Sequence, residues 1–369
     1  MTEPLSKIPE GLQYCFGAEA RLRRSIEDTS MSVFAGWSYE EISTPTVDYY
    51  SLFERGMGAL EACKAFKFSD ADGRLLALRP DITSGIARAA ATLLAHRLRP
   101  LRLCYAASAF RQQRPSHSEW RRAFVQIGAE LIGKNSIVAD MEILAIVSEI
   151  LRHLDLNYVI TLNDAEIFHG VVESLALDAG ARDDLRQLVD TRNAADLEKF
   201  LRPFASAADC HAFSELIRLS GKRETFPKAR RIIANTRSSA ALNRLEGLWQ
   251  IVESISLSDR FEIDLGDLSN LDYYTGLTFK IYVEGAGTRV GSGGRYDHLT
   301  ENFGKSEPAV GFVLDLEMLS ALLKRRNPNQ PESRPDCITS DDACAMFREA
   351  LDKRSRDTRI AINPRGVAS

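Results

Sequence analysis

Residues 277–291 read Leu-Thr-Phe-Lys-Ile-Tyr-Val-Glu-Gly-Ala-Gly-Thr-Arg-Val-Gly. Strand-forming residues at Leu277–Val283 and Thr288–Gly291 flank the polar, glycine-containing turn Glu284–Gly287. This arrangement is typical of a β-hairpin, because glycine adopts the backbone conformations that a tight turn requires. The stretch therefore predicts two neighbouring antiparallel strands near the C-terminal end of the fold.

A second hairpin is predicted near the N-terminus. Lys64–Phe68 and Arg74–Leu78 flank Ser69–Gly73, another polar linker that ends in glycine. Consecutive hairpins favour a mostly antiparallel sheet with helices packed beside it. We therefore expect an α+β fold rather than a doubly wound α/β fold.

Helical periodicity predicts the helices that pack beside this sheet. Apolar residues recur at near-helical spacing over Glu19–Phe34 and over Ile82–Leu98, and Ser136 is placed to cap a long helix that follows it. Further strands are predicted at Tyr39–Ile42, Leu101–Tyr105, Ala123–Glu130, Tyr158–Leu162 and Arg260–Asp264.

The pattern changes along the chain and divides it into four segments. Strand signals stop over residues 170–248, where helical periods are separated by glycine and proline, so we expect a helical insertion there. The insertion splits a core into a first part, residues 1–169, and a second part, residues 249–325. Residues 326–369 turn polar and proline-rich, which indicates a tail or a small docked element.

Composition excludes several classes of protein. The chain has 369 residues, 44% of them hydrophobic, which is enough apolar surface for a core. Its 47 Lys and Arg against 51 Asp and Glu give a net charge of −4, which argues against a protein that mainly grips nucleic-acid backbone. No signal peptide and no long apolar run is apparent, so we expect a cytoplasmic protein without a membrane span.

No metal or cofactor motif is apparent. The six cysteines are scattered without a Cys-x-x-Cys pair, and the six histidines show no metal-ligand spacing. Gly128–Asn135 matches the frame of a phosphate-binding loop, but Asn135 stands where a magnesium-binding hydroxyl is needed. We therefore predict no metal and no cofactor.

A cluster of arginines is the first candidate for binding. Residues 88–122 contain eight arginines, and Glu119 is the one acidic residue among them: Arg88, Arg97, Arg99, Arg102, Arg111, Arg114, Arg121 and Arg122. Guanidinium groups bind carboxylates and phosphates in a bidentate manner, so this cluster suits an anionic ligand or an acidic partner. A solvated basic face is the alternative.

The strand Phe124–Glu130 is a second candidate. Gln126, Gly128 and Glu130 share one face of it, because side chains alternate along a strand. A small ligand with an ammonium or imidazole group could lie over Gly128, between the amide and the carboxylate. An ordinary solvent-facing strand is the alternative.

Four different motifs follow one another along the chain: Leu78–Thr83, Ala109–Arg111 leading to Phe124–Gln126, Leu271–Gly276, and Gly293–Asp297 with Gly311–Phe312. In this order they resemble the signature segments of histidyl-tRNA synthetase-like class II proteins. The resemblance runs from Pro9 to about Leu323 and includes Gly36–Pro45, which is similar to the dimer-forming first motif. It implies a class II aminoacyl-tRNA synthetase-like antiparallel sheet flanked by helices and a self-dimer through the N-terminal motif.

The resemblance also implies a histidine-binding site. Arg111 takes the position that binds the carboxylate or α-phosphate side of the ligand, and Asp81 stands where the synthetases carry a glutamate that meets the amino group. The pocket that carries over, residue by residue, consists of Asp81, Thr83, Arg111, Gln126, Glu130, Tyr273 and Tyr274.

Several positions depart from the synthetase pattern. Ser269 and Met318 replace two arginines that stabilise charge during adenylate formation in the synthetases. Ala123 replaces a glutamate in the second motif, and the 50 residues after Leu319 are too few for the usual anticodon-binding domain. Adenylation is largely electrostatic stabilisation, so we expect that this chain has lost it and does not bind tRNA.

A synthetase-like core without these features resembles the family of regulatory subunits of ATP phosphoribosyltransferase. That resemblance implies a partner, the short-form catalytic subunit, in a hetero-octamer that performs the first step of histidine biosynthesis, with histidine as a feedback effector. Two alternatives stay open: an active histidine-activating enzyme that uses other cations such as Arg289 or Arg295, and a histidine sensor with another partner.

Overall fold

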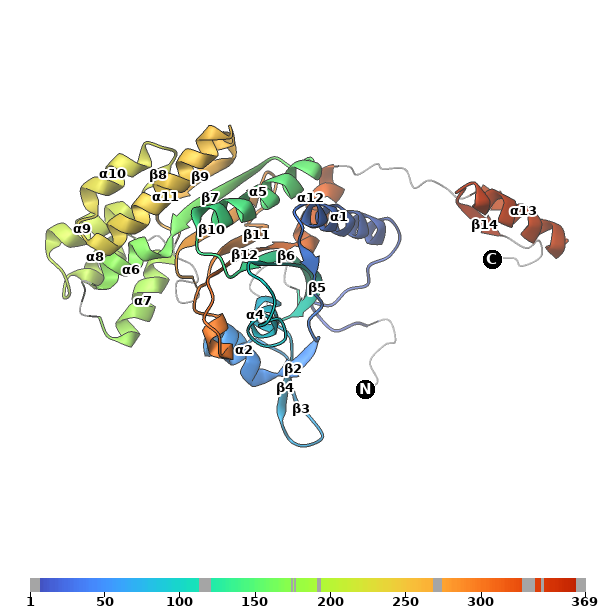
Figure 1. Ribbon diagram of the computed structural model, residues 1–369, viewed down its shortest axis with the longest axis horizontal. Helices are drawn as coiled ribbons and strands as arrows, with labels where there is room; N and C mark the ends of the chain where they lie inside the picture. Colours follow the sequence, from blue (N-terminus) through green and yellow to red (C-terminus); the bar gives the residue numbers. More distant parts are fainter. Residues whose placement is uncertain are drawn as a thin grey trace. The chain divides into compact units, whose positions relative to one another are not determined.

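The computed structural model describes residues 7–112, 121–173, 175, 177–190, 194–267, 274–326, 336–339 and 342–362. The chain forms two compact units, Met1–Leu323 and Lys324–Ser369. The first contains the sheet predicted above, and the second is a small β-α-β element (Figure 1).

A nine-stranded sheet is the centre of the first unit. Its strand order is β1-β5-β6-β12-β11-β10-β7-β9-β8. The β1–β5 and β7–β9 pairs are parallel, and the other neighbouring pairs are antiparallel. The strands are β1 (Glu40–Glu41), β5 (Leu101–Phe110), β6 (Ala123–Ile132), β7 (Tyr158–Asp164), β8 (Ser220–Gly221), β9 (Phe261–Asp264), β10 (Leu277–Val283), β11 (Gly291–Arg295) and β12 (Ala309–Asp315).

Three long helices lie on one face of this sheet and contribute, together with the strands and other helices, to the main core. They are α1 (Gly17–Gly36), α5 (Ile137–His153) and α11 (Thr236–Ser254). Alternate residues of the strands, such as Ile127, Ala129 and Leu131 of β6, point into this core. The intervening residues of the same strands, among them Gln126 and Glu130, therefore point to the opposite face.

Two helix boundaries test the sequence-based predictions. Ser136 caps α5, and its hydroxyl accepts a hydrogen bond from the Ala139 amide at 3.3 Å, which confirms the predicted cap. The predicted helix over Ile82–Leu98 is shorter than expected, since α4 spans Thr83–Ala91. Beyond it the Leu94 amide bonds to the Ala89 carbonyl at 2.8 Å, five residues back, so the helical pattern is broken there.

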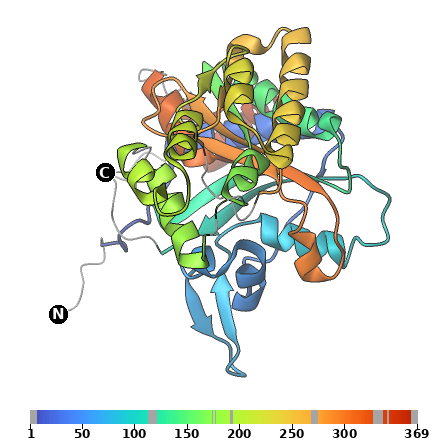
Figure 2. The same cartoon turned by 90° about the vertical axis from the view of Figure 1, so that its left-hand side faces the viewer.

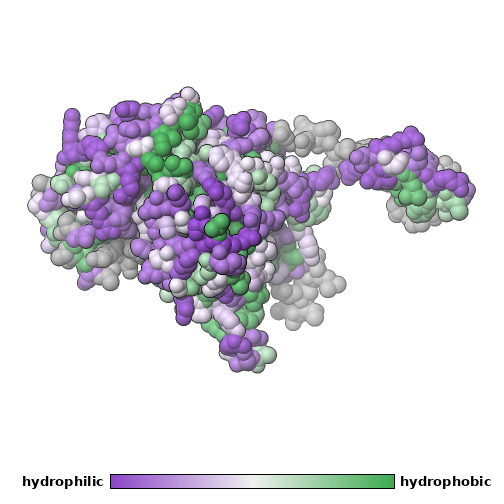
Figure 3. Space-filling model, viewed as in Figure 1, coloured by the Kyte–Doolittle hydropathy of each residue, from purple (hydrophilic) through white to green (hydrophobic). Residues whose placement is uncertain are grey.

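The N-terminal hairpin belongs to a separate three-stranded sheet. Its order is β2-β4-β3, where β2 is Val47–Tyr49, β3 is Lys67–Ser69 and β4 is Leu75–Leu78, and the β3–β4 pair confirms the predicted hairpin. Helices α2 (Tyr50–Met57) and α3 (Ala59–Ala62) lie beside it in the chain. Apolar residues gather over this sheet, above its polar tip (Figure 3).

The helical insertion gathers at one end of the large sheet, the end that faces the viewer in Figure 2. It comprises α6 (Ala165–Glu173), α7 (Ala179–Asp190), α8 (Ala194–Leu201), α9 (Ala207–Leu216) and α10 (Thr225–Ile232), followed by α11. Helices α6 to α9 enclose a core of their own, whereas α11 contributes to the main core. One short strand, β8, lies within the segment that was expected to be purely helical, and it pairs with β9.

The second unit contains β13 (Asp336–Ile338), α13 (Ala343–Ser355) and β14 (Ile360–Ile362). The two strands are parallel, and α13 joins them. Ile338, Met346 and Ala350 form its small core. Helix α12 (Leu316–Arg326) precedes this unit in the chain. Among the helices in the described part of the chain, none is both long and apolar enough to cross a membrane.

Candidate functional site

Glu130 is the centre of the candidate site. It lies on β6, on the sheet face opposite the main core, and its exposed fraction is 2%. Thr83, the first residue of α4, donates a hydrogen bond from its hydroxyl to Glu130 Oε1 at 2.7 Å, and the Tyr296 hydroxyl donates to Oε2. The carboxylate is thus held from two sides. The alternative of a solvent-facing strand was wrong for this face.

Burial governs the ionisation of Glu130. Desolvation raises its pKa to about 7, while the hydroxyl groups of Tyr296, Thr83 and Tyr105 oppose the rise, and the negative charge of Asp81 adds to it. Hydroxyl donors favour the ionised form, and a nearby anion disfavours it. A cation placed beside Glu130 would favour the carboxylate, so the site suits a ligand with a positive group.

Asp81 provides the second carboxylate. The Ser84 hydroxyl donates to Asp81 Oδ2 at 3.0 Å, but Asp81 Oδ1 is buried without a hydrogen-bond partner. Burial raises the pKa of Asp81, and both the Ser84 hydrogen bond and the nearby Arg111 lower it. An unpaired buried oxygen is costly, so Asp81 is prepared to accept a hydrogen bond from a ligand.

Arg111 directly follows β5 and lies near Asp81, the pKa of which it lowers. Its Nε donates to the Pro80 carbonyl at 2.8 Å, and its guanidinium lies over the Phe124 ring, 5.6 Å from the ring centre. These contacts fix the stem of the side chain. Gln126 lies on the site face with 9% of its surface exposed.

The space over Gly128 is occupied, which corrects the expected ligand position. Gly128 pairs with Tyr105 of β5, and a Cβ added at Gly128 would lie 2.5 Å from the Tyr105 hydroxyl oxygen. The glycine makes room for this tyrosine rather than for a ligand. Sequence analysis missed Tyr105 because strand register, which no sequence motif encodes, brings it over Gly128.

Tyr274 borders the other side of the site. A Cβ added at Gly294 of β11 would lie 2.7 Å from Cδ1 of Tyr274, so the Tyr274 ring covers this glycine. Gly294 pairs with Gly311, and Glu130 Oε2 lies against Gly311. The structure therefore brings together Asp81, Thr83, Glu130 and Tyr274. Tyr273 and Ser269 lie outside the described residues.

Acidic groups occupy the far end of the site face. Asp315 pairs with Gln126 across β12 and β6, and its carboxylate caps α12 by accepting from the Met318 amide at 2.9 Å. Burial raises the pKa of Asp315 to about 6, and the negative charge of Glu317 adds to this rise. The hydrogen bond from the Met318 amide lowers the pKa. Met318, which takes the place of an arginine in the synthetases, packs against the main core. Sequence analysis missed Asp315.

The arginine cluster does not form an open basic wall. Four of its members pair with acids from distant parts of the chain: Arg88 with Asp48, Arg97 with Glu40, Arg99 with Glu307, and Arg102 with Glu142. The local sequence hid these counter-charges, because each lies at least 40 positions away. Arg114 lies outside the described residues.

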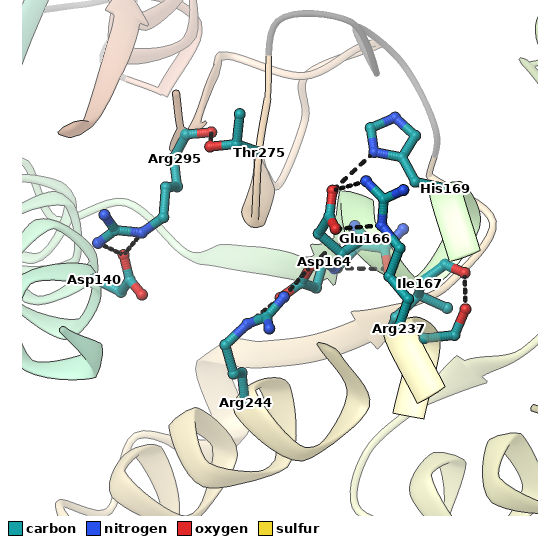
Figure 4. A network of polar contacts seen from close by, with 11 residues as sticks. Asp140, Asp164, Glu166, Ile167, His169, Arg237, Arg244, Thr275 and Arg295 are labelled. Carbon is teal, nitrogen blue, oxygen red and sulfur yellow. Dashed lines mark hydrogen bonds and ion pairs between the residues drawn. The ribbon is translucent and has the colours of Figure 1, made fainter. Parts of the chain in front are cut away.

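Arg295, one of the cations considered for catalysis, forms a structural ion pair. It alternates with Gly294 along β11 and so points to the face that α5 covers. Its guanidinium binds Asp140 of α5 at 2.5 Å, and 6% of the side chain is exposed (Figure 4). A buried arginine on this face is separated by the sheet from Glu130.

Comparison with known proteins identifies the family of the chain. The sequence profile of the family Histidyl-tRNA synthetase matches residues 11–319. A protein of Moorella thermoacetica named ATP phosphoribosyltransferase regulatory subunit is 34% identical over 361 residues, which cover 97% of this chain and 92% of the relative. A protein of the same name from Acetivibrio thermocellus is 32% identical, over 96% of this chain and 86% of its own length.

Solved structures show the same fold. The crystal structure of an ATP phosphoribosyltransferase regulatory subunit/histidyl-tRNA synthetase from Bacillus halodurans superposes with a TM-score of 0.89 at 26% identity, covering 100% of this chain and 95% of the other. Histidyl-tRNA synthetase from Nostoc shares the fold, with a TM-score of 0.81 at 20% identity over 99% of this chain and 88% of its own. The chain therefore belongs to the histidyl-tRNA synthetase family, among the relatives named ATP phosphoribosyltransferase regulatory subunit.

Proposed function

We propose that this chain is the regulatory, non-catalytic subunit of an ATP phosphoribosyltransferase and supports the first step of histidine biosynthesis through a short-form catalytic subunit. The observation that carries the proposal is the similarity to relatives of that name along 97% of the chain. The structure adds a site whose buried carboxylates suit an amino acid and whose far end is acidic.

Histidine is the effector that we propose for this site. Asp81 offers an unpaired buried oxygen, and Glu130 has a pKa of about 7 that a neighbouring cation would lower. An amino acid with an ammonium group and an imidazole can provide two groups that these carboxylates bind, and Arg111 can meet its carboxylate. Since Tyr105 covers Gly128, we place the ligand between Asp81 and Tyr274.

The chain's own adenylation activity is, in our proposal, lost. Adenylation needs cations around the phosphates, and removing a single preorganised donor of this kind costs roughly 2.7–4 kcal/mol of transition-state stabilisation. Met318 provides no charge, Arg295 is buried in its pair with Asp140, and Asp315 adds a carboxylate to the site face.

A self-dimer through the N-terminal motif is part of the proposal. Strand β1 is an edge of the large sheet, so among the described residues one side of it has no strand partner. Beside it the Arg97–Glu40 ion pair holds a loop that exposes Leu93 and Leu98, at 75% and 93%. An edge strand next to exposed leucines suits contact with a second copy. Two such dimers with four catalytic subunits would give the hetero-octamer.

The regulatory mechanism that we propose is allosteric. Histidine can shift the assembly between states of different activity only if it binds one state more tightly than the other. Its site on this chain and the active site on the catalytic subunit are then linked through the interface between the subunits.

The decisive experiment mixes the purified chain with a short-form catalytic subunit. We expect the mixture to form phosphoribosyl-ATP, the catalytic subunit alone to be much less active, and histidine to inhibit the mixture. Failure to raise the activity of the catalytic subunit would reject the proposal and favour a histidine sensor with another partner. Histidine-dependent ATP–pyrophosphate exchange by the chain alone would instead revive the histidine-activating enzyme.

A second experiment locates the effector. Calorimetry should show that Glu130→Ala and Arg111→Ala bind histidine more weakly than the wild-type chain. Unchanged affinity in both variants would place the effector outside this pocket, for example at a subunit interface.

A further inference from the structure

The backbone at Leu265 and Gly266, directly after β9, is attached to the helical insertion. The Leu265 amide donates to the Leu219 carbonyl at 3.0 Å, just beyond the end of α9. At the next residue, a Cβ on Gly266 would lie 1.9 Å from the Ile217 carbonyl oxygen. The backbone after β9 and the backbone after α9 are thus in direct contact.

Tyr274, which lies shortly before β10, also contacts the insertion. This side chain packs against the separate core of α6 to α9, which contains Phe168, Leu197 and Phe213. It also packs against the cluster beneath the site, which contains Tyr105 and Tyr296. Within the described part of the chain, Tyr274 is the residue that packs against both clusters.

Tyr274 is close to the carboxylate of the site. Its ring covers Gly294, and Glu130 Oε2 lies against Gly311, the direct partner of Gly294 on the next strand. Neighbouring strands lie about 4.8 Å apart, so Tyr274 and Glu130 occupy adjacent positions on the site face. A ligand that binds Glu130 would therefore contact or displace the ring.

Ion pairs join helix α11 to the large sheet and to α6, the first helix of the insertion (Figure 4). Arg244 of α11 binds Asp164 at the end of β7 at 3.0 Å, and Arg237 binds Glu166 of α6 at 2.5 Å. The Ser238 hydroxyl also donates to the Ile167 carbonyl at 2.6 Å. Helices α6 and α11 are thus held together, and α7, α8 and α9 pack against α6.

We propose that histidine in the pocket changes the packing of helices α7 to α9 through Tyr274, the positioning residue that contacts both the pocket and the core of the insertion. This inference rests on the proposed function, because it takes histidine as the ligand. It assigns the insertion the role of the element that responds to the effector. The aromatic ring of Tyr274, rather than its hydroxyl, transmits the change from the pocket to helices α7 to α9.

Hydrogen–deuterium exchange of the full chain, with and without saturating histidine, tests the proposal. We expect histidine to slow exchange in α4, which borders the pocket, and to change exchange in α7 to α9 by about threefold or more, as a shift in local opening requires. Because Tyr274 also borders the pocket, Tyr274→Ala is measured at a histidine concentration raised until the response of α4 is complete again; at that occupancy the response of α7 to α9 should vanish. Tyr274→Phe should retain both responses.

Phe200→Ala is the matched control. Phe200 packs against the same insertion core but not against the cluster beneath the site. This variant should exchange faster throughout α7 to α9 while the response to histidine remains. Loss of the response in both Phe200→Ala and Tyr274→Ala would show general loosening of the insertion and would overturn the role of Tyr274.

The wild-type chain provides a test that depends on no variant. If histidine protects α4 and leaves α7 to α9 unchanged, the coupling does not exist, although histidine binding stands. If histidine changes neither region, the pocket is not the effector site, and the failure lies in the proposed function.

Discussion

The carboxylate of Glu130 lies against the backbone of Gly311 on the neighbouring strand, where a Cβ would be 1.6 Å from Glu130 Oε2. The pairing of β6 with β12 places the two residues directly opposite each other. Glycine at 311 is therefore what allows a glutamate to lie on this sheet face, and the site depends on both residues.

Gly311→Ala should displace the Glu130 carboxylate and weaken histidine binding by about tenfold or more, equivalent to losing one charge-assisted hydrogen bond. Isothermal titration calorimetry measures the change. Gly287→Ala is the control, because a Cβ at Gly287 meets no atom within 4 Å. Equal affinity in Gly311→Ala and wild type would mean that Glu130 does not bind the ligand.

Glu130→Gln should remove a pH dependence of stability. Burial raises the pKa of Glu130 to about 7 from an ordinary value of 4.5, so the folded chain holds this proton more tightly than the unfolded chain. Glu130 therefore stabilises the fold most below pH 4.5, and this stabilisation is lost as the pH rises towards 7. The difference in free energy of unfolding between wild type and Glu130→Gln should fall over this range by up to about 3 kcal/mol. Urea unfolding at several pH values tests this, and a constant difference would contradict the raised pKa.

Arg295→Gln should destabilise the first unit by roughly 3–5 kcal/mol, because it leaves Asp140 largely buried without its cation. Arg97→Gln is the matched control: its ion pair with Glu40 is exposed, with 44% and 63% of the two side chains accessible. Such a pair contributes about 1 kcal/mol or less. Urea unfolding of both variants measures the difference. Similar small losses would show that Arg295 is not a structural anchor.

Met318→Arg should not restore ATP–pyrophosphate exchange. It returns one cation to a region where Asp315 and Glu317 already provide negative charge, and Glu317 is held by Arg23 and by the Val125 amide. Exchange with radiolabelled pyrophosphate in the presence of histidine is the measurement. Activity in this single variant would show that the loss of adenylation rests on position 318 alone.

Much of the fold was predictable because local patterns carry it. Glycine-containing turns between strand-forming runs predicted both hairpins, and the cap at Ser136 predicted the start of α5. The start of β11 was misplaced: the strand was expected at Thr288–Gly291 and spans Gly291–Arg295. The three glycines of that strand have low strand propensity, and pairing with β10 and β12 overrides it.

The candidate site was predictable only as a set of residues. The order of motifs along the chain indicated Asp81, Thr83, Arg111, Gln126 and Glu130, since side-chain chemistry and spacing are properties of the sequence. The alternation of side chains put Gln126 and Glu130 on one face. Neither the order of the motifs nor the alternation of side chains shows which residues of the folded chain lie against that face.

What the sequence alone determined is the family, the order of the elements and the chemical identity of the site residues. Only the tertiary structure decided that Tyr105 occupies the space over Gly128, that distant acids pair with four of the eight arginines of the cluster, and that Tyr274 contacts both the pocket and the insertion. These facts depend on strand register and on contacts between residues far apart in the chain. Such contacts form when the chain packs, because burial and charge pairing act through space and not along the sequence.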